Sequence, residues 1–500
     1  MKVRLLHPDR DAELHPAAAP GDPDLITDLD LQPVLDLMVP TRLLKDVPHT
    51  LLRPLTDPQV IAWRQRVVAD ALAHPAVVRG LFDLAEGALE RQRASWAAPG
   101  RTAESLLANA LTSLTAVLPS MRELSHFARQ HRAMVSSPGL SGLFERLIDE
   151  LDAEYLDEVA GMLAQLHSSS ASVARARMTD SVLVGSLELL APQQRRTWRN
   201  VLGLGGQGRF RFTVPVGDDA GTRAVEELRN EAIFEVSVVL AEAAHHVTSF
   251  FRQLRWEAGF VVGATQLAAH LTAAGVPLCW PDPLTSTQGT VRATGLVNLS
   301  LAVRAGKAPV PNDVVADARP LMVFTGANQG GKTTLLRSLG CAQLLMQSGL
   351  FVPADAFTAE VAPAMHTHFR GAEEQSLQSG RLDDELRRMS SIIDRCHRGD
   401  LVMMNEPFAS TDEIEGSYIG EEIIDALLRH GLRVMVVTHL HALASRYLDR
   451  PGTLFLRAER LPDGRRTYRV LPDRPKPTSH GLDIYESVFG DPLAERPPGP

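Results

Sequence analysis

A glycine-rich turn constrains the fold of this 500-residue chain more than any other stretch. Apolar residues at 321–325 precede the turn, and apolar residues at helical spacing follow it up to residue 349. The turn fits G-x-x-x-x-G-K-[ST], a strand, loop and helix that bind phosphate groups through backbone N–H groups and the positive end of the helix. We therefore expect these residues to bind a nucleotide: Gly326, Ala327, Asn328, Gln329, Gly330, Gly331, Lys332, Thr333 and Thr334.

Two side chains at the end of this turn have distinct expected roles. Lys332 would neutralise charge on the β- and γ-phosphates of the nucleotide, and the hydroxyl of Thr333 would bind Mg²⁺. The chain has 51 lysine and arginine residues, and only five of them are lysines. A lysine at the position where a compact ammonium group is required therefore supports the nucleotide site.

The length and composition favour a globular protein of several domains. A chain of 500 residues exceeds what one hydrophobic core supports, and its 44% hydrophobic and 22% charged residues are ordinary values. The sequence contains no apolar run typical of a membrane span, no signal-peptide pattern, and no paired spacing among Cys279, Cys341 and Cys396. We expect a cytoplasmic protein with no membrane segment, no disulfide framework and no zinc site.

Composition and the positions of proline and glycine divide the chain into parts. Residues 1–30 contain few large apolar residues and favour a loosely held leader, either a disordered tail or a functional arm. Residues 31–300 favour an all-α domain with a short β-like insertion near 181–216. Residues 301–490 alternate strand-like and helical runs, which is typical of an α/β domain with a parallel sheet, and residues 491–500 form a tail.

Proline and glycine positions predict the limits of individual elements. In the helical part we expect separate helices over 103–118 and 121–134, divided at Pro119, and one helix over 140–167. Near the end of the chain, strand-like runs at 453–457 and 467–471 predict a hairpin that closes one edge of the sheet.

The net charge of −9 argues against a surface that is basic overall, so nucleic-acid binding would need a local feature. One candidate is the segment 181–216, in which five arginines are interleaved with Trp198, Phe210 and Phe212. Arginine next to aromatic rings can contact phosphates or bases. A solvated loop with a hairpin is the alternative, and it is favoured because only five arginines are involved.

An apolar run at 401–404 ends in Asn405 and Glu406, which makes it the expected second strand of the nucleotide site. In the usual arrangement an aspartate holds the metal through water and the next glutamate is the general base. We therefore expect Glu406 to activate water and to lie, with Thr333 and Asn405, at the Mg²⁺. Since the amide of Asn405 brings no negative charge, metal affinity or turnover would be reduced.

Two further segments point to the nucleotide. His439 follows a strand-like run at 432–438, where its side chain could reach the γ-phosphate, and a cap on the strand end is the alternative. Ser379 and Gly380 open an amphipathic helix whose N-terminus is another anion site. Because the first phosphate site is filled within the chain, Ser379 and Gly380 could serve the nucleotide of a partner subunit.

Six motifs together resemble the ATPase domain of the MutS family, in the same order and at similar spacing over about 310–490. Asn328 within the turn and the FVPA sequence after the next helix are features of MutS, and the resemblance to ABC-type ATPases is more distant. The helical half is similar in character to the core and lever helices of MutS. The six motifs are TGANQGGKTT, GLFVPA, SGRLDDELRRM, LVMMNEPFASTDEIEG, VVTHLHAL and TSHGLDIYESVFG.

The chain departs from the MutS pattern in three respects. We expect no mismatch-reading domain, because no Phe-x-Glu wedge occurs in the sequence. Only 181–216 is available in place of the large DNA clamp, and Asn405 occupies the position of an aspartate. These differences remove the direct basis for mismatch recognition and leave the ATP-driven part.

The resemblance implies an ABC-like α/β P-loop ATPase domain preceded by an all-α core and lever domain. It also implies a homodimer with two ATP molecules and Mg²⁺ between the glycine-rich turn of one subunit and Ser379-Gly380 of the other. ATP would close the dimer on DNA and hydrolysis through Glu406 would release it, in mismatch repair or recombination. The alternative is an ATP-switched binding or assembly protein with a protein or RNA partner and slow hydrolysis.

Overall fold

The chain forms two compact units, and each is described by itself. The helical unit contains Met1–Val3, Arg79–Val135 and Leu140–Arg255, and the sheet unit contains Arg4–Val78, Ser136–Gly139 and Trp256–Pro500. The computed structural model describes residues 1–15, 17, 19, 21–39, 41, 44–95, 102–169, 173–178, 184–190, 219–285, 288–327, 329–369, 380–461 and 465–476, and the statements below concern these residues.

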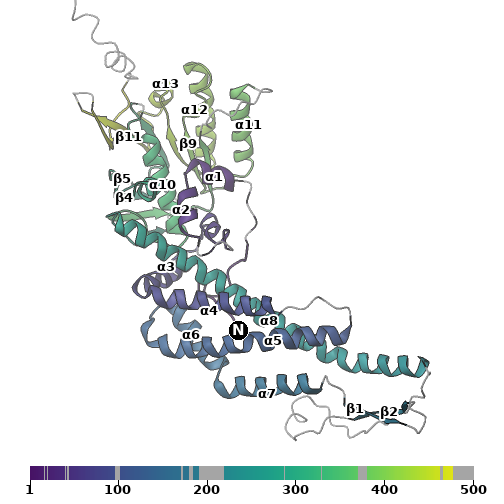
Figure 1. Cartoon of the computed structure of the whole chain (residues 1–500). Helices are drawn as coiled ribbons and strands as arrows, with labels where there is room; N and C mark the ends of the chain where they lie inside the picture. The colour runs from purple at the N-terminus through teal and green to yellow at the C-terminus, as the bar shows by residue number, and fades with distance from the viewer. Residues whose placement is uncertain are drawn as a thin grey trace, which may run out of the picture. The chain divides into compact units, whose positions relative to one another are not determined.

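Long helices and one antiparallel hairpin make up the helical unit (Figure 1). The hairpin pairs β1 with β2, and fully buried side chains such as Leu124, Leu143 and Phe144 form the core. Most of the arginine-rich segment 181–216, including all five of its arginines, lies outside the described residues. The elements are α4 (Pro75–Ala94), α5 (Ala103–His131), η2 (Arg132–Met134), α6 (Pro138–Glu150), α7 (Ala153–Ser169), β1 (Val173–Met178), β2 (Val184–Leu190) and the first part of α8 (Asp219–Ala273).

The helix limits in this unit differ from those expected at two places. α5 continues through Pro119, where we expected a break. Proline removes a helical hydrogen bond, but burial of the flanking Leu118 and Met121 outweighs that loss. The single helix expected over 140–167 is divided into α6 and α7, because Asp152 accepts a hydrogen bond from the Tyr155 N–H and begins a new helix there.

Two sheets form the centre of the other unit. The larger has the strand order β12-β11-β6-β10-β9-β8, and all its neighbours are parallel except β11 and β12. The smaller has the order β3-β7-β4-β5 and is mixed. Their strands are β3 (Asp282–Leu284), β4 (Val291–Leu296), β5 (Asn312–Ala316), β6 (Leu321–Thr325), β7 (Ala356–Glu360), β8 (Met365–Phe369), β9 (Leu401–Asn405), β10 (Arg433–Val437), β11 (Thr453–Arg460) and β12 (Arg466–Pro472).

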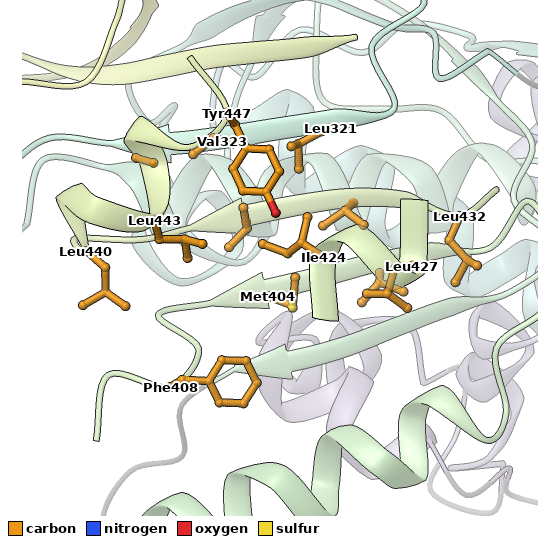
Figure 2. Close-up of a cluster of buried hydrophobic side chains, with 14 of the residues drawn as sticks. Leu321, Val323, Met404, Phe408, Ile424, Leu427, Leu432, Leu440, Leu443 and Tyr447 are labelled. Carbon is orange, nitrogen blue, oxygen red and sulfur yellow. The ribbon is translucent and has the colours of Figure 1, made fainter. Parts of the chain in front are cut away.

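Helices cover both faces of the larger sheet. A Cβ at Gly340 of α10 would meet the side chain of Met403, whereas the neighbouring Met404 faces a cluster with α12 and α13 (Figure 2). Neighbouring residues of β9 therefore pack against different helices, as in an α/β fold. The helices are α1 (Asp22–Asp28), α2 (Gln32–Leu37), η1 (Val47–Leu52), α3 (Pro58–Ala73), α9 (Leu299–Ala305), α10 (Lys332–Gln347), α11 (Arg381–Ile393), α12 (Glu413–Arg429) and α13 (His441–Ser445).

The expected mixed α/β domain and all-helical part are both present, and β11 and β12 form the expected hairpin at the edge of the sheet. The contacts group residues 4–78 and 256–300 with the sheets, whereas we expected a division near residue 300. No described helix is both long and apolar enough to cross a membrane.

The first residues are held more firmly than the loose leader we expected. Leu5 and Leu6 are fully buried, and their N–H groups both donate to the carboxylate of Glu257, at 2.7 and 2.9 Å. Farther along, Arg388 of α11 donates to Asp28 at the end of α1 at 2.6 Å. Partners more than 250 residues away hold this segment, so its own composition does not reveal its attachment.

Candidate functional site

The glycine-rich turn lies between β6 and α10, and its backbone requires glycine at specific positions. Gly326 has φ of 104° and Gly331 has φ of 98°, values that side chains disfavour. A Cβ on Gly330 would lie 2.7 Å from the Cβ of Ala458. The backbone can therefore curve as a phosphate loop must. Asn328 lies outside the described residues.

Lys332 begins α10 and places its ammonium group inside the turn. Its side chain is buried, and Nζ donates to the carbonyl oxygens of Gly326 at 2.6 Å and Ala327 at 3.1 Å. Burial lowers the pKa of Lys332, and the carboxylate of Glu406 raises it in part. Lys332 and Glu406 therefore interact electrostatically. A phosphate bound beside Lys332 would stabilise its charged form.

Thr333 and Asn405 meet although 72 residues separate them. The Thr333 hydroxyl donates to Asn405 Oδ1 at 2.7 Å. Asn405 is the last residue of β9, and β6 and β9 both pair in parallel with β10, so their carboxyl ends lie at one edge. A hydroxyl and an amide oxygen together with the Glu406 carboxylate form the all-oxygen set that Mg²⁺ prefers, so these residues fit the expected metal.

Glu406 and His439 follow neighbouring strands and face each other. Glu406 Oε2 lies 3.8 Å from His439 Nδ1, and both side chains are partly exposed. The Glu406 N–H donates to Val437 O at 2.8 Å, which fixes its backbone beside β10. Its φ of 52° is unusual for a residue with a side chain and costs on the order of 1–3 kcal/mol. Such strain is common where a reactive group must be aimed.

A cavity of about 540 Å³ opens against the turn. The residues that line it include Gly330, Lys332, Thr333, Thr334 and Glu406. The end of the turn and the residue after β9 thus line one cavity, which is large enough for the phosphates of a nucleotide. Gly326, Asn405 and His439 lie next to lining residues without lining the cavity themselves.

Sequence reasoning missed part of the lining of this cavity. Asn312 and Tyr468 line it, and Asn312 joins their strands by donating to Tyr468 O at 3.3 Å and accepting from the Val470 N–H at 2.7 Å. Arg466 on the same strand donates to Gln329 Oε1 at 2.7 Å. The motif Val-Pro-Asn-Asp at 310–313 was visible in the sequence, but nothing local linked it to residues 156 positions away.

Gly380 precedes α11 and is exposed, with open space around the position of a Cβ. It is absent from the lining of the cavity beside the turn. Ser379 lies outside the described residues. The assignment of these two residues to a partner's nucleotide stays a prediction.

One group of His, Cys and Asp side chains lies at the opposite edge of the larger sheet. His366, Cys396 and Asp400 offer ligand atoms within 4.8 Å of one another. The Asp400 carboxylate, however, already accepts hydrogen bonds from the N–H groups of Ala364 and His397 and contacts His366 Nε2 at 3.1 Å. Both oxygens of this buried carboxylate already have partners within the chain, so we assign no metal there.

Two family models match the chain, the MutS2 N-terminal domain over residues 56–274 and MutS domain V over residues 322–485. Similar curated proteins include Endonuclease MutS2 of Shouchella clausii, which is 32% identical over 166 residues, 32% of this chain and 21% of that protein. Endonuclease MutS2 of Thermus thermophilus is 37% identical over 134 residues, 26% of this chain and 18% of that protein. The aligned segments span about a fifth of these relatives.

Proposed function

Because this chain belongs to the MutS family, we propose that it binds ATP with Mg²⁺ at the glycine-rich turn and couples hydrolysis to a conformational change on DNA. The observation that supports the proposal most is that Lys332, Thr333 and Glu406 line one cavity, with Asn405 hydrogen-bonded to Thr333 beside it. Phosphate, metal and water would each find a suitable group within this set.

Each residue has a specific role in this proposal. Lys332, which donates to backbone carbonyl oxygens, would donate to phosphate oxygens instead, and Thr333 and Asn405 would hold the metal directly or through water. Magnesium, when bound, neutralises charge on the β- and γ-phosphates. Glu406 accepts a proton from the attacking water, and His439, which is 3.8 Å from it, senses the γ-phosphate.

The finer architecture is part of the same proposal. An ABC-like homodimer would place Ser379 and Gly380 of one subunit at the nucleotide of the other, since an exposed helix N-terminus attracts an anion. ATP binding would join the subunits, and hydrolysis would separate them. The helical unit would carry the change to bound DNA in repair or recombination.

We do not extend the endonuclease activity in the relatives' names to this chain, because the aligned segments cover about a fifth of those proteins. A second candidate function is an ATP-switched binding or assembly protein with a protein or RNA partner and slow hydrolysis. Asn405 favours it, because the amide that contacts Thr333 brings no charge to the metal. The net charge of −9 favours it as well.

The ATPase part is tested by Glu406→Gln. Without the carboxylate, single-turnover hydrolysis should fall by about 100-fold or more while ATP still binds, because the amide cannot accept the proton. Lys307→Ala, an exposed substitution, is the control. Unchanged hydrolysis in Glu406→Gln would mean that the base is assigned incorrectly.

The DNA part is tested by gel shifts on duplex, mismatched and four-way-junction DNA, with and without ATP, over a range of salt concentrations. Binding that weakens steeply with salt would support contacts to phosphates. Absence of binding at low salt, in a protein that hydrolyses ATP, would favour the protein or RNA partner.

A further inference from the structure

The turn that follows the proposed base has an unusual backbone. Glu406 has φ of 52° and Phe408 has φ of 58°, with Pro407 between them. Positive φ is uncommon for residues other than glycine and is a true outlier for a bulky one such as phenylalanine. A turn of this kind persists only where the surrounding structure holds it in place.

Contacts to β10, to a buried cluster and to α11 hold this turn. The Glu406 N–H donates to Val437 O at 2.8 Å, which fixes the start of the turn to β10. The Phe408 ring is fully buried in the cluster with α12 (Figure 2). The Phe408 N–H donates to Glu385 Oε2 at 2.8 Å, which fixes the end of the turn to α11.

The contact from Glu385 differs from the other two. Val437 and the buried cluster belong to the sheet and to the helices that cover it, whereas Glu385 lies on α11, four residues after its start. That helix follows Gly380, the residue proposed to meet a second nucleotide. Glu385 is half-buried, so its carboxylate is shielded in part while it accepts this hydrogen bond.

We propose that Glu385 is a positioning residue for hydrolysis, which holds the turn so that Glu406 faces the cavity. The inference rests on the proposed function, because it requires Glu406 to be the base. The hydrogen bond makes the direction of the Glu406 side chain depend on where α11 lies. A contact at the start of α11 is thereby transmitted to the base through one side chain.

Three substitutions of Glu385 separate this role from a general effect on folding. Glu385→Ala removes the acceptor, and Glu385→Asp keeps the charge but shortens the side chain by one methylene. Glu385→Gln keeps an oxygen at the same reach without the charge. We expect single-turnover hydrolysis to slow by about 30-fold in the Ala and Asp variants and to stay within about threefold of the original in the Gln variant.

Binding of a fluorescent ATP analogue is measured on the same samples, and its Kd should change by less than about twofold. Asp394→Ala is the matched control, an exposed acidic residue directly after α11, and it should hydrolyse ATP at the original rate. If Glu385→Ala does not fold, the contrast between Asp and Gln decides. Equal rates in these two variants would overturn the inference.

Glu406→Gln is measured in parallel to distinguish two kinds of failure. If Glu406→Gln stops hydrolysis and the Glu385 variants behave like the original protein, the positioning role alone is wrong. If Glu406→Gln hydrolyses ATP normally, the proposed base is wrong and the positioning role fails with it. A loss of ATP binding in Glu385→Gln would also overturn the inference.

Discussion

The two edges of the large sheet both carry charged or polar side chains, but they use them differently. At the edge where the parallel strands begin, fully buried Asp400 accepts two backbone N–H bonds, and Arg433 donates to the carbonyl oxygens of Glu360 and Gly399. At the edge where the strands end, Glu406 is strained and partly exposed beside a cavity. Charged groups satisfied by backbone are structural, whereas groups that face open volume are available for a ligand.

The largest expected effect is on stability, at the first of these edges. Asp400→Ala leaves the buried N–H groups of Ala364 and His397 without an acceptor, which should lower the free energy of unfolding by roughly 4 kcal/mol. Urea denaturation measures this loss. Asp449→Ala, at a highly exposed aspartate, should change little. If Asp400→Ala were as stable as the original protein, the structural role assigned to this edge of the sheet would be wrong.

The next effect depends on pH and concerns His368 of β8. Burial, with a contribution from Arg388, lowers the pKa of His368 to about 4 from its ordinary 6.5. Between these values the unfolded chain takes up a proton that the folded chain does not, so stability falls as pH falls from 6.5 to 4, by up to about 3 kcal/mol. Urea denaturation at pH 7 and pH 4.5 should show a smaller difference for His368→Phe, but not for His430→Gln, an exposed control.

At the nucleotide edge, Lys332→Ala should weaken ATP binding by about 100-fold, which is about 2.7 kcal/mol, because a charge-assisted contact to phosphate is lost. Titration with a fluorescent ATP analogue measures the affinity. Lys307→Ala removes an exposed lysine and should bind as the original does. If Asp400→Ala lost ATP binding and Lys332→Ala bound ATP normally, the roles assigned to the two edges of the sheet would be reversed.

The smallest effect tests the unusual amide. Asn405→Asp adds a carboxylate beside Thr333 and should lower the Mg²⁺ concentration needed for ATP binding by about tenfold, because charge on the ligands sets the affinity for the metal. Asn405→Leu, of similar size without an oxygen, should raise it. Binding that does not respond to Mg²⁺ in either variant would show that this position does not contact the metal.

Local patterns predicted the strands of the site well. The runs at 321–325 and 401–404 coincide with β6 and β9, and that at 432–438 with β10, because buried parallel strands are continuous apolar runs. Proline was a poorer guide, since packing on both sides of Pro119 keeps α5 continuous. Helix ends depend on burial that the sequence does not display.

The sequence by itself determined the glycine-rich turn between β6 and α10, the strand that ends in Asn405 and is followed by Glu406, and the resemblance that the family models confirm. These features are local in the sequence, because they depend on short spacings between residues and on the backbone conformation of a few neighbouring positions. Only the tertiary structure decided that Asn312 and Tyr468 line the cavity beside the turn, that Glu257 holds the first residues, and that Glu385 contacts the turn after Glu406. Such pairs are brought together by the packing of the whole unit, and no periodicity in the sequence records them.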